Sequence, residues 1–382
     1  MPSEACTWST SDSGSPASDT TAAGSFSTTS RASCRRAELT APARERLVVT
    51  GAAARRSRAW ICGLTAVLAV VLAASLFVGA NPIAPGDVWA ALTGGGSEEA
   101  QFVVWDQRAP RIVAGVMVGM ALGVAGALIQ AFTRNPLADP GVLGVNAGAA
   151  FFIAIGIAFF GITRPSEYVW LACAGALVIT TAVYLLGSSR RGPTDPIRMT
   201  VAGVAVGAVL SGLTTGVTLT HPDVFDRMRG WNAGTLLERG PDVLLATAPL
   251  LLIGLLLAMA AAPALNSVAL GTDVARSHGV RLVRVQVTAV VGITLLAGTA
   301  TAIAGPISFV GLMIPHVVRW CVGTDQRRIF AVSLLAAPTL VMIADMAGRV
   351  AVPGEMPAGI VTAFIGAPVL IALVRRRRAS TL

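Results

Sequence analysis

From Trp60 onward the sequence consists of apolar runs separated by short polar connections. The runs are mostly about 20 residues long, which is the length that a helix needs to cross the hydrocarbon core of a membrane. They predict ten membrane-spanning helices, at residues 60–80, 109–131, 142–161, 167–187, 199–219, 242–262, 285–305, 308–321, 329–352 and 357–374. We therefore expect an all-α polytopic membrane protein whose ten-helix domain covers residues 59–378.

Residues 1–58 differ in composition from the rest of the chain. Residues 1–33 are rich in Ser and Thr and have almost no large apolar side chains, so they cannot bury enough surface to offset the entropy lost on ordering. We expect residues 1–58 to be a disordered cytoplasmic tail. The first apolar run exceeds the core of a secretory signal, about 7–15 residues, and more runs follow, so we interpret it as a retained helix.

The distribution of arginine predicts the orientation in the membrane. The sequence has 29 basic residues, all of them arginine, and a net charge of +9. With the N-terminus inside, seventeen arginines from residue 55 onward fall on the cytoplasmic side and seven on the outer side, as the positive-inside rule requires. We expect a multi-pass protein of the cell membrane with both termini in the cytoplasm. The positive charge then reflects topology, and nucleic acid is not an expected partner.

Residue types that carry chemistry are scarce in this sequence. A chain without lysine has no P-loop lysine and does not hydrolyse ATP by that chemistry. Paired carboxylates, a catalytic triad and zinc-type cysteine spacing are also missing from the sequence, so we expect no catalysis and no bound metal or cofactor. Asp345 lies four residues before Arg349 on one face of the ninth predicted helix, which favours a structural ion pair.

Small residues recur at intervals of four in two of the predicted helices. In the second and the fifth helix, respectively, these are Gly115, Gly119 and Gly123, and Gly203, Gly207 and Ser211. Stripes of this kind predict tightly crossed helices in a membrane. A second interpretation is that the fifth helix lines a moving pathway and uses small residues to tolerate repacking.

One soluble-looking stretch on the predicted cytoplasmic side, residues 266–284, is here called the knob. Two short amphipathic turns separated by Gly271 predict a compact protruding segment. From the residues alone, the knob is either an ordinary connecting loop or the place where a motor subunit pushes on a transporter.

Four long motifs follow one another along the apolar part of the chain. They are RAPR at 108–111, TRNPLADPGVLGVNAG at 133–148, GPISFVGL at 305–312 and EMPAGIVTA at 355–363. Together they resemble the FecCD family, the permease subunits of ABC importers for iron–siderophore complexes, haem and cobalamin. The resemblance covers residues 60–378 and implies ten helices per subunit, with two subunits around a central translocation pathway.

The resemblance also implies two sets of functional residues and contributes to a third. The set that docks on a cytoplasmic ATPase is Leu265, Asn266, Ala269, Leu270, Gly271, Ala275, Arg276, His278 and Gly279. The set that receives carboxylates of a binding protein is Arg108, Arg111 and Arg349, with anchoring of helix ends as the alternative for Arg111. The set expected to line the pathway combines Gly203, Gly207 and Ser211, taken from the small-residue stripe of the fifth helix, with Trp231 and Asn232, whose segment resembles a family pattern. His278 departs from the family, which usually has an aliphatic residue there.

These expectations combine into one functional prediction. The chain is expected to be the permease subunit of an ABC importer that takes up ferric–siderophore complexes by alternating access. Its expected partners are a cytoplasmic ATPase dimer that uses ATP and Mg²⁺, an extracytoplasmic substrate-binding protein, a second permease subunit and membrane lipid. The alternatives are a cobalamin or haem importer of the same architecture and, from a different class, a proton-coupled secondary carrier.

Overall fold

The structure is a computed structural model that describes residues 43–188, 196–237 and 239–376. By their contacts the residues divide into two units, 1–52 and 53–382. The described part of the first unit is the start of one helix, and the second unit contains the remaining helices. Most of the predicted tail, residues 1–42, lies outside the described residues.

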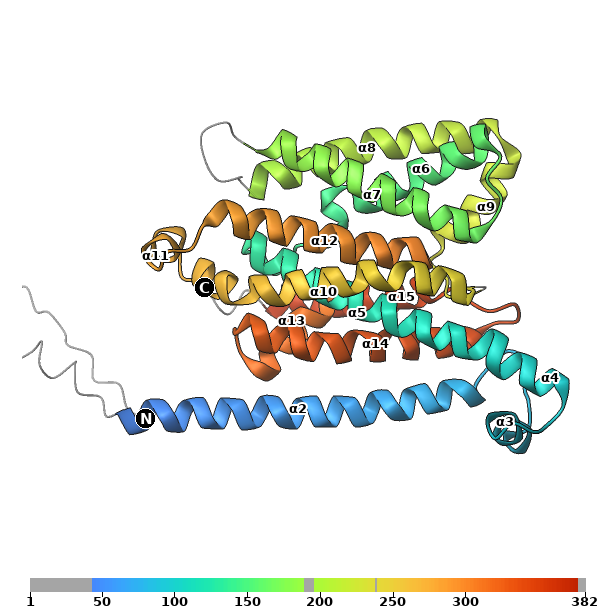
Figure 1. Ribbon diagram of the computed structural model, residues 1–382. Coiled ribbons are helices and arrows are strands. Elements are labelled where there is room, and N and C mark those ends of the chain that lie inside the picture. The colour runs from blue at the N-terminus through green and yellow to red at the C-terminus, as the bar shows by residue number, and fades with distance from the viewer. Residues whose placement is uncertain (1–42, 189–195, 238, 377–382) are drawn as a thin grey trace, which may run out of the picture. The chain divides into compact units, whose positions relative to one another are not determined.

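The ten predicted membrane helices are all present, and every regular element of the described residues is a helix (Figure 1). They are α2 (Ala43–Phe77), α5 (Ala109–Thr133), α6 (Val145–Phe160), α7 (Pro165–Gly187), α8 (Pro196–Thr220), α10 (Pro241–Ala269), α12 (Leu282–Ala304), α13 (Val310–Val322), α14 (Gln326–Ala351) and α15 (Ala358–Arg376). The connections contain α3 (Pro85–Leu92), α4 (Glu98–Gln101), the π-helix η1 (Phe102–Arg108), the 3₁₀ turn η2 (Pro140–Leu143), α9 (Pro222–Asn232) and α11 (Thr272–Ser277).

The helices differ in their capacity to span a membrane. Seven helical segments of the described residues are long and apolar enough to cross one: α2, α5 with its preceding turns, α7, α8, α10, α12 and α14. Helices α6, α13 and α15 are apolar but shorter. The fold class predicted from the apolar runs, an all-α polytopic membrane protein, is therefore confirmed.

The boundary predicted between tail and membrane domain is wrong. Helix α2 begins at Ala43, so residues 43–58, which were assigned to the disordered tail, are helical. Residues 43–58 are rich in Ala and Arg, which favour helices, and so differ in composition from the Ser/Thr-rich residues 1–33 on which the prediction of disorder rested. The apolar part of the helix that is long enough to cross a membrane runs from Arg56 to Phe77.

The glycine stripe of α5 fits this helix directly against α14. A Cβ atom added to Gly123 would lie 2.5 Å from the Cβ of Ala337, and one added to Gly119 would overlap the backbone of Pro338. Helices in lipid associate through such close backbone approach. The prediction that this stripe packs helices is therefore confirmed, and α5 and α14 form a closely interlocked pair (Figure 1).

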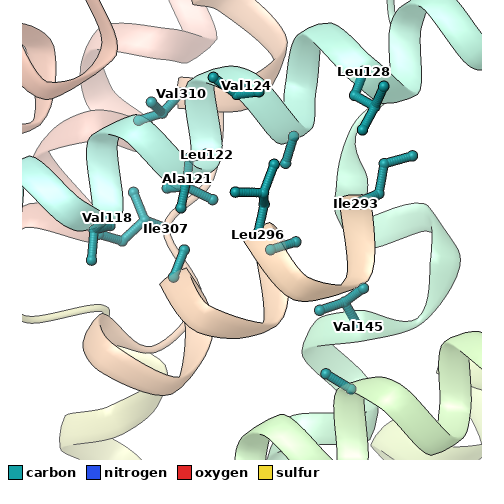
Figure 2. Close-up of a cluster of buried hydrophobic side chains, with 14 of the residues drawn as sticks. Val118, Ala121, Leu122, Val124, Leu128, Val145, Ile293, Leu296, Ile307 and Val310 are labelled. Atoms are coloured by element: carbon teal, nitrogen blue, oxygen red, sulfur yellow. The ribbon is translucent and has the colours of Figure 1, made fainter. Parts of the chain in front are cut away.

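The hydrophobic core lies around α5, which also packs against α12 and α13. Figure 2 shows Leu122 and Leu128 of α5 in one buried cluster with Ile293 and Leu296 of α12. On another side of α5, a Cβ on Gly126 would overlap the carbonyl group of Gly311 in α13. Helix α5 is therefore enclosed by protein over most of its length.

Helix α8 has the opposite character. Most of its surface is exposed within this chain, including the large apolar side chains Ile197, Val201, Val209 and Leu219. It contacts mainly α6, α7, α9 and η2, and touches α5 only slightly. One helical face of α8 is therefore available to lipid or to another subunit.

Candidate functional site

Five charged side chains meet at the end of α14 that lies away from α11. This charged cluster is Arg108, Arg111, Asp345, Arg349 and Glu355. Arg111 donates from Nη2 to Asp345 Oδ1 at 2.8 Å and from Nη1 to Glu355 Oε2 at 2.7 Å. Arg349 donates from Nε to Asp345 Oδ2 at 3.0 Å. The predicted structural pair of Asp345 and Arg349 is confirmed, and Arg111 joins it from α5.

The arginines of this cluster also hold the chain at and just beyond the C-terminal end of α2. Arg349 donates from Nη1 to the carbonyl oxygens of Ser75 and Val78, at 3.0 and 2.9 Å. Arg108 donates from Nη2 to the carbonyl oxygen of Asn81 at 2.8 Å. The last carbonyl groups of a helix have no partner within the helix, so donors from outside stabilise its end. Arg108 is 5% exposed and Arg349 is 3% exposed, so both are engaged inside the chain.

The charges of the cluster do not balance. Three guanidinium groups face two carboxylates, which leaves one positive charge in excess. All members of the cluster except Asp345 line a cavity of about 170 Å³, which Gly79, Asn81 and Gln107 also line. The predicted docking arginines therefore share one site, a buried electropositive pocket, instead of standing separately on a surface.

The knob forms a tight turn between α10 and α12. Helix α10 ends at Ala269, and Gly271 then takes a φ of +118°, a conformation that favours glycine. The short helix α11 follows, and Gly279, with a φ of +76°, reverses the chain so that the Val280 amide donates to the Ala275 carbonyl at 3.0 Å. The glycines that the resemblance assigned to the knob are therefore the positions that the turn itself requires.

The predicted coupling residues divide into two groups. Those on the surface are Ala269, Leu270, Arg276, His278 and Gly279. Leu270 is 70% exposed at the tip of α10, although it is a large apolar side chain. Leu265 and Ala275, in contrast, are buried, and Asn266 is half-buried against α14. The surface group is free to contact a partner, whereas the inward group determines how the knob sits on the chain.

The structure brings all five predicted pathway residues to one cavity. Gly203, Gly207, Ser211, Trp231 and Asn232 line a space of about 480 Å³, here called the α8 cavity. It is open on one side, and its other lining residues come from α6, α8, the α5–α6 connection and Pro306. A neighbouring space of about 570 Å³ shares the lining residues Asn232 and Pro306 and continues along α15. The small-residue spacing and the family resemblance therefore identified, from the sequence alone, residues that line the same cavity.

Within the α8 cavity, the glycines of α8 serve two purposes. A Cβ on Gly203 would overlap the carbonyl oxygen of Val142, so this position packs the helix against η2. A Cβ on Gly207 would meet only the Cβ of Ala147, at 3.9 Å, so this position is glycine without a steric need inside the chain. Both interpretations of the stripe therefore have support, at different residues.

Two polar side chains that the sequence did not assign also belong to the lining of the α8 cavity. Asp139 and Asn146 line it, and Asn146 accepts a hydrogen bond from Thr301 of α12 at 2.8 Å. Asp139 and Asn146 stand in the 133–148 motif, so the signal was present but named no role. The indole nitrogen of Trp231, also a cavity residue, is buried without a hydrogen-bond partner in the described part of the chain.

Asp139 stands in the connection between α5 and α6, outside the membrane-spanning helices. Burial raises the pKa of its carboxyl group above the ordinary value, because a charged carboxylate is poorly solvated there. The backbone amide of Gly141 donates to its Oδ1 at 2.8 Å, which acts in the opposite direction and more weakly. The α8 cavity therefore has one acidic group whose charge depends on pH.

The described residues include no group of three His, Cys, Asp or Glu side chains that could hold a metal ion. A bundle of membrane helices with an open cavity along α8 and a short protruding helix between two spans fits a membrane transport protein. The chain belongs to the FecCD transport family, whose sequence model matches residues 67–376.

Individual relatives agree with this assignment. The ferric enterobactin transport system permease protein FepD of Escherichia coli (strain K12) is 49% identical over 319 residues, which cover 82% of this chain and 94% of that protein. The vitamin B12 import system permease protein BtuC of Yersinia enterocolitica is 36% identical over 318 residues, 81% of this chain and 91% of that protein. A solved metal-chelate type ABC transporter in an inward-facing conformation superposes with a TM-score of 0.72 at 25% identity, over 83% of this chain and 98% of that one.

Proposed function

We propose that this chain is the permease subunit of an ABC importer that takes up ferric–siderophore complexes. The observation that carries the proposal is the 49% identity to a ferric enterobactin permease over 82% of the chain, together with a cavity at the predicted pathway residues. A separate ATPase dimer hydrolyses ATP with Mg²⁺, and this chain converts that work into a change of access. It holds no resident cofactor, since the ferric complex is cargo.

The orientation follows from the arginine distribution, with both termini and the knob in the cytoplasm and the charged cluster on the outer side. In this orientation the exposed group of the knob meets the ATPase. Leu270 is the main apolar contact, because a leucine that is 70% exposed in water gains free energy by entering a groove of a partner. Arg276 and His278 surround it with polar contacts.

A second permease subunit completes the pathway. Helix α8 presents an exposed face with apolar side chains and with Gly212 and Gly216. Apart from the adjoining turns of α8 itself, no described residue comes within 4 Å of a Cβ added at these two glycines. We propose that this face turns toward the second subunit and that the α8 cavity forms one wall of the central route. Cargo passes when the two subunits change their separation.

The docking role of Arg108, Arg111 and Arg349 takes a modified form in this proposal. Because the arginines already hold carboxylates and carbonyl groups of this chain, the contribution to docking is the excess positive charge beneath the outer surface. Such a charge attracts the acidic side chains of a binding protein over a distance and speeds encounter. The same contacts fix the helix ends that form the surface.

Reconstitution in lipid vesicles tests the function. The chain, the ATPases and the binding protein are assembled together and supplied with ferric catecholates, ferric hydroxamates, haem or vitamin B12. We expect ATP-dependent uptake of a ferric siderophore. The 36% identity to a vitamin B12 permease makes cobalamin the second candidate, and preferential uptake of vitamin B12 or of haem would replace the proposed cargo. Uptake without the ATPases would contradict the ABC mechanism and favour a proton-coupled carrier.

The variant Leu270→Asp tests the coupling surface in the same vesicles. We expect it to abolish stimulation of the ATPase and cargo uptake while the melting temperature of the isolated chain stays unchanged, because Leu270 packs little within the chain. Leu270→Met is the matched control that keeps the apolar contact and should preserve both activities. Normal uptake by Leu270→Asp would show that the knob is not where the ATPase acts.

A further inference from the structure

Asn266 connects the knob to the beginning of α14. Its Nδ2 donates to Oδ1 of Asp325 at 2.9 Å, and its Oδ1 accepts from the backbone amide of Gln326 at 2.8 Å. The two hydrogen bonds use both halves of the side-chain amide. They join residues 59 and 60 positions apart in the sequence, across the junction of α10 and α14.

The partner carboxylate is itself fixed to α14. Asp325 is the N-cap of that helix and accepts from the backbone amide of Arg327 at 3.1 Å, and its Oδ2 lies 3.4 Å from Nε of Arg328. A side chain at this position supplies an acceptor to amides that have none in the first turn. Asn266 is therefore bonded to the capped end of α14, so a displacement of the α10 end displaces that helix.

Helix α14 reaches from this junction to the charged cluster. Along its length it is interlocked with α5, where Gly119 and Gly123 leave no room for a side chain against Pro338 and Ala337. Its other end carries Asp345 and Arg349, which bind Arg111 of α5 and the backbone at the end of α2. One helix thus has specific polar contacts at the knob and at the opposite end of the bundle.

We propose that Asn266 is a positioning residue that transmits movement between the knob and α14, and through α14 to the charged cluster. The inference rests on the proposed function, since it assigns Asn266 a role in coupling, but it removes Asn266 from the surface that touches the ATPase. Binding of the ATPase at one end and of the binding protein at the other then bias the same element. Such coupling is reciprocal between the two sites.

The chemistry of the link provides a matched set of variants. Asn266→Asp removes the donor and sets a carboxylate against Asp325, which breaks the contact. Combining it with Asp325→Asn exchanges donor and acceptor, because the amide at 325 donates to the carboxylate at 266, which still accepts from Gln326. Because Oδ1 of Asp325 faces residue 266 and also accepts from the Arg327 amide, turning the amide nitrogen toward residue 266 gives up that N-cap hydrogen bond, so the double variant recovers the link to residue 266 but not the cap. Asp325→Asn alone keeps an acceptor toward Asn266 and serves as the control.

The complete complex in vesicles gives the decisive measurement, which is the ATP hydrolysed per cargo molecule and the stimulation of the ATPase by the binding protein. We expect Asn266→Asp to raise the ATP hydrolysed per cargo molecule, and to lower the stimulation of the ATPase by the binding protein, each by about fivefold or more. Fivefold is the lower end of ordinary allosteric coupling. The double variant should restore both, and all variants should assemble with the ATPase as the wild type does. Wild-type values for Asn266→Asp, or a double variant no better than the single one, would overturn the inference.

Amide hydrogen exchange at Gln326, measured on the chain alone in lipid nanodiscs, tests the link without partners. Asn266→Leu removes the acceptor of the Gln326 amide and should accelerate exchange there, whereas Asp325→Asn leaves that acceptor in place and should not. Unchanged exchange would refute the link itself. If the wild-type complex couples ATP hydrolysis to uptake and Asn266→Asp does so equally well, the inference fails and the proposed function stands. If the wild type does not couple ATP to uptake, the proposed function fails and the coupling role of Asn266 fails with it.

Discussion

Replacing Asp345 by alanine is expected to be among the most damaging single changes in this chain. Asp345 is 0% exposed and accepts hydrogen bonds from two guanidinium groups, those of Arg111 and Arg349. Its removal leaves three arginines facing a single carboxylate, that of Glu355, so the excess charge of the cluster rises from one to two. The arginine that holds the end of α2 loses its counter-charge at the same time.

The expected size follows from this geometry. Breaking a buried ion pair by removing one partner costs about 3–5 kcal/mol, because the remaining charge is left uncompensated. Glu355→Ala is the matched control: Glu355 is 19% exposed as a side chain and accepts one bond from Arg111. Loss of one charge-assisted hydrogen bond costs about 2 kcal/mol. The two variants should differ by about 2 kcal/mol, roughly a thirtyfold difference in the unfolding constant.

Equilibrium unfolding in detergent micelles or bicelles measures both free energies on the same scale. Asp345→Asn belongs in the series, because it keeps the shape and an acceptor but removes the charge, and it should fall between the other two. If Asp345→Ala proved no more destabilising than Glu355→Ala, the cluster would not be the buried, charge-coupled unit described above.

Two further predictions concern the α8 cavity. Gly203→Ala should destabilise the chain by about 1–3 kcal/mol, as overpacking does, because the added methyl group overlaps the Val142 carbonyl. Gly207→Ala is the control and should leave the thermal unfolding midpoint unchanged, so equal midpoints for the two variants would contradict the packing role of Gly203. The raised pKa of Asp139 means that the folded chain holds its proton more tightly than the unfolded chain, so this group's contribution to stability falls as pH rises from the ordinary carboxyl pKa through the raised one. Asp139→Asn should therefore have the same free energy of unfolding as the wild type at low pH and a larger one at neutral pH, measured by unfolding across that pH range. A larger free energy of unfolding for the wild type at neutral pH would refute this.

The helices and much of the site were predictable from the sequence, because membrane insertion leaves a strong local signal. A span must be apolar over its whole length, so the ten runs correspond to ten helices. The pair of Asp345 and Arg349 was predictable as well, because residues four apart face each other on a helix. The knob could be recognised by its glycines, which the turns at Gly271 and Gly279 require.

Contacts between distant segments were not predictable by the same means. Arg349 bonds the carbonyl of Ser75 across 274 positions of sequence, and no local pattern shows that the end of α2 needs a donor there. The arginines therefore looked like surface residues, although they are buried. Asn266 and Ala275 were grouped with the exposed coupling residues for the same reason, since the direction of a side chain near a helix end depends on the neighbouring helix.

The unequal packing of the described helices indicates where conformational change is accommodated. Helices α5, α13 and α14 meet through glycines whose replacement would overlap backbone atoms, as at Gly119 and Gly126, so they cannot shift against one another without losing many contacts. Helix α8 has the reverse arrangement: Gly207, Gly212 and Gly216 have space around them, and a large cavity lies beside the helix. Under the coupling proposed above, a movement that begins at the knob and passes into α14 would displace the interlocked helices as one body. The rearrangement would then fall along α8, where the chain leaves room for it.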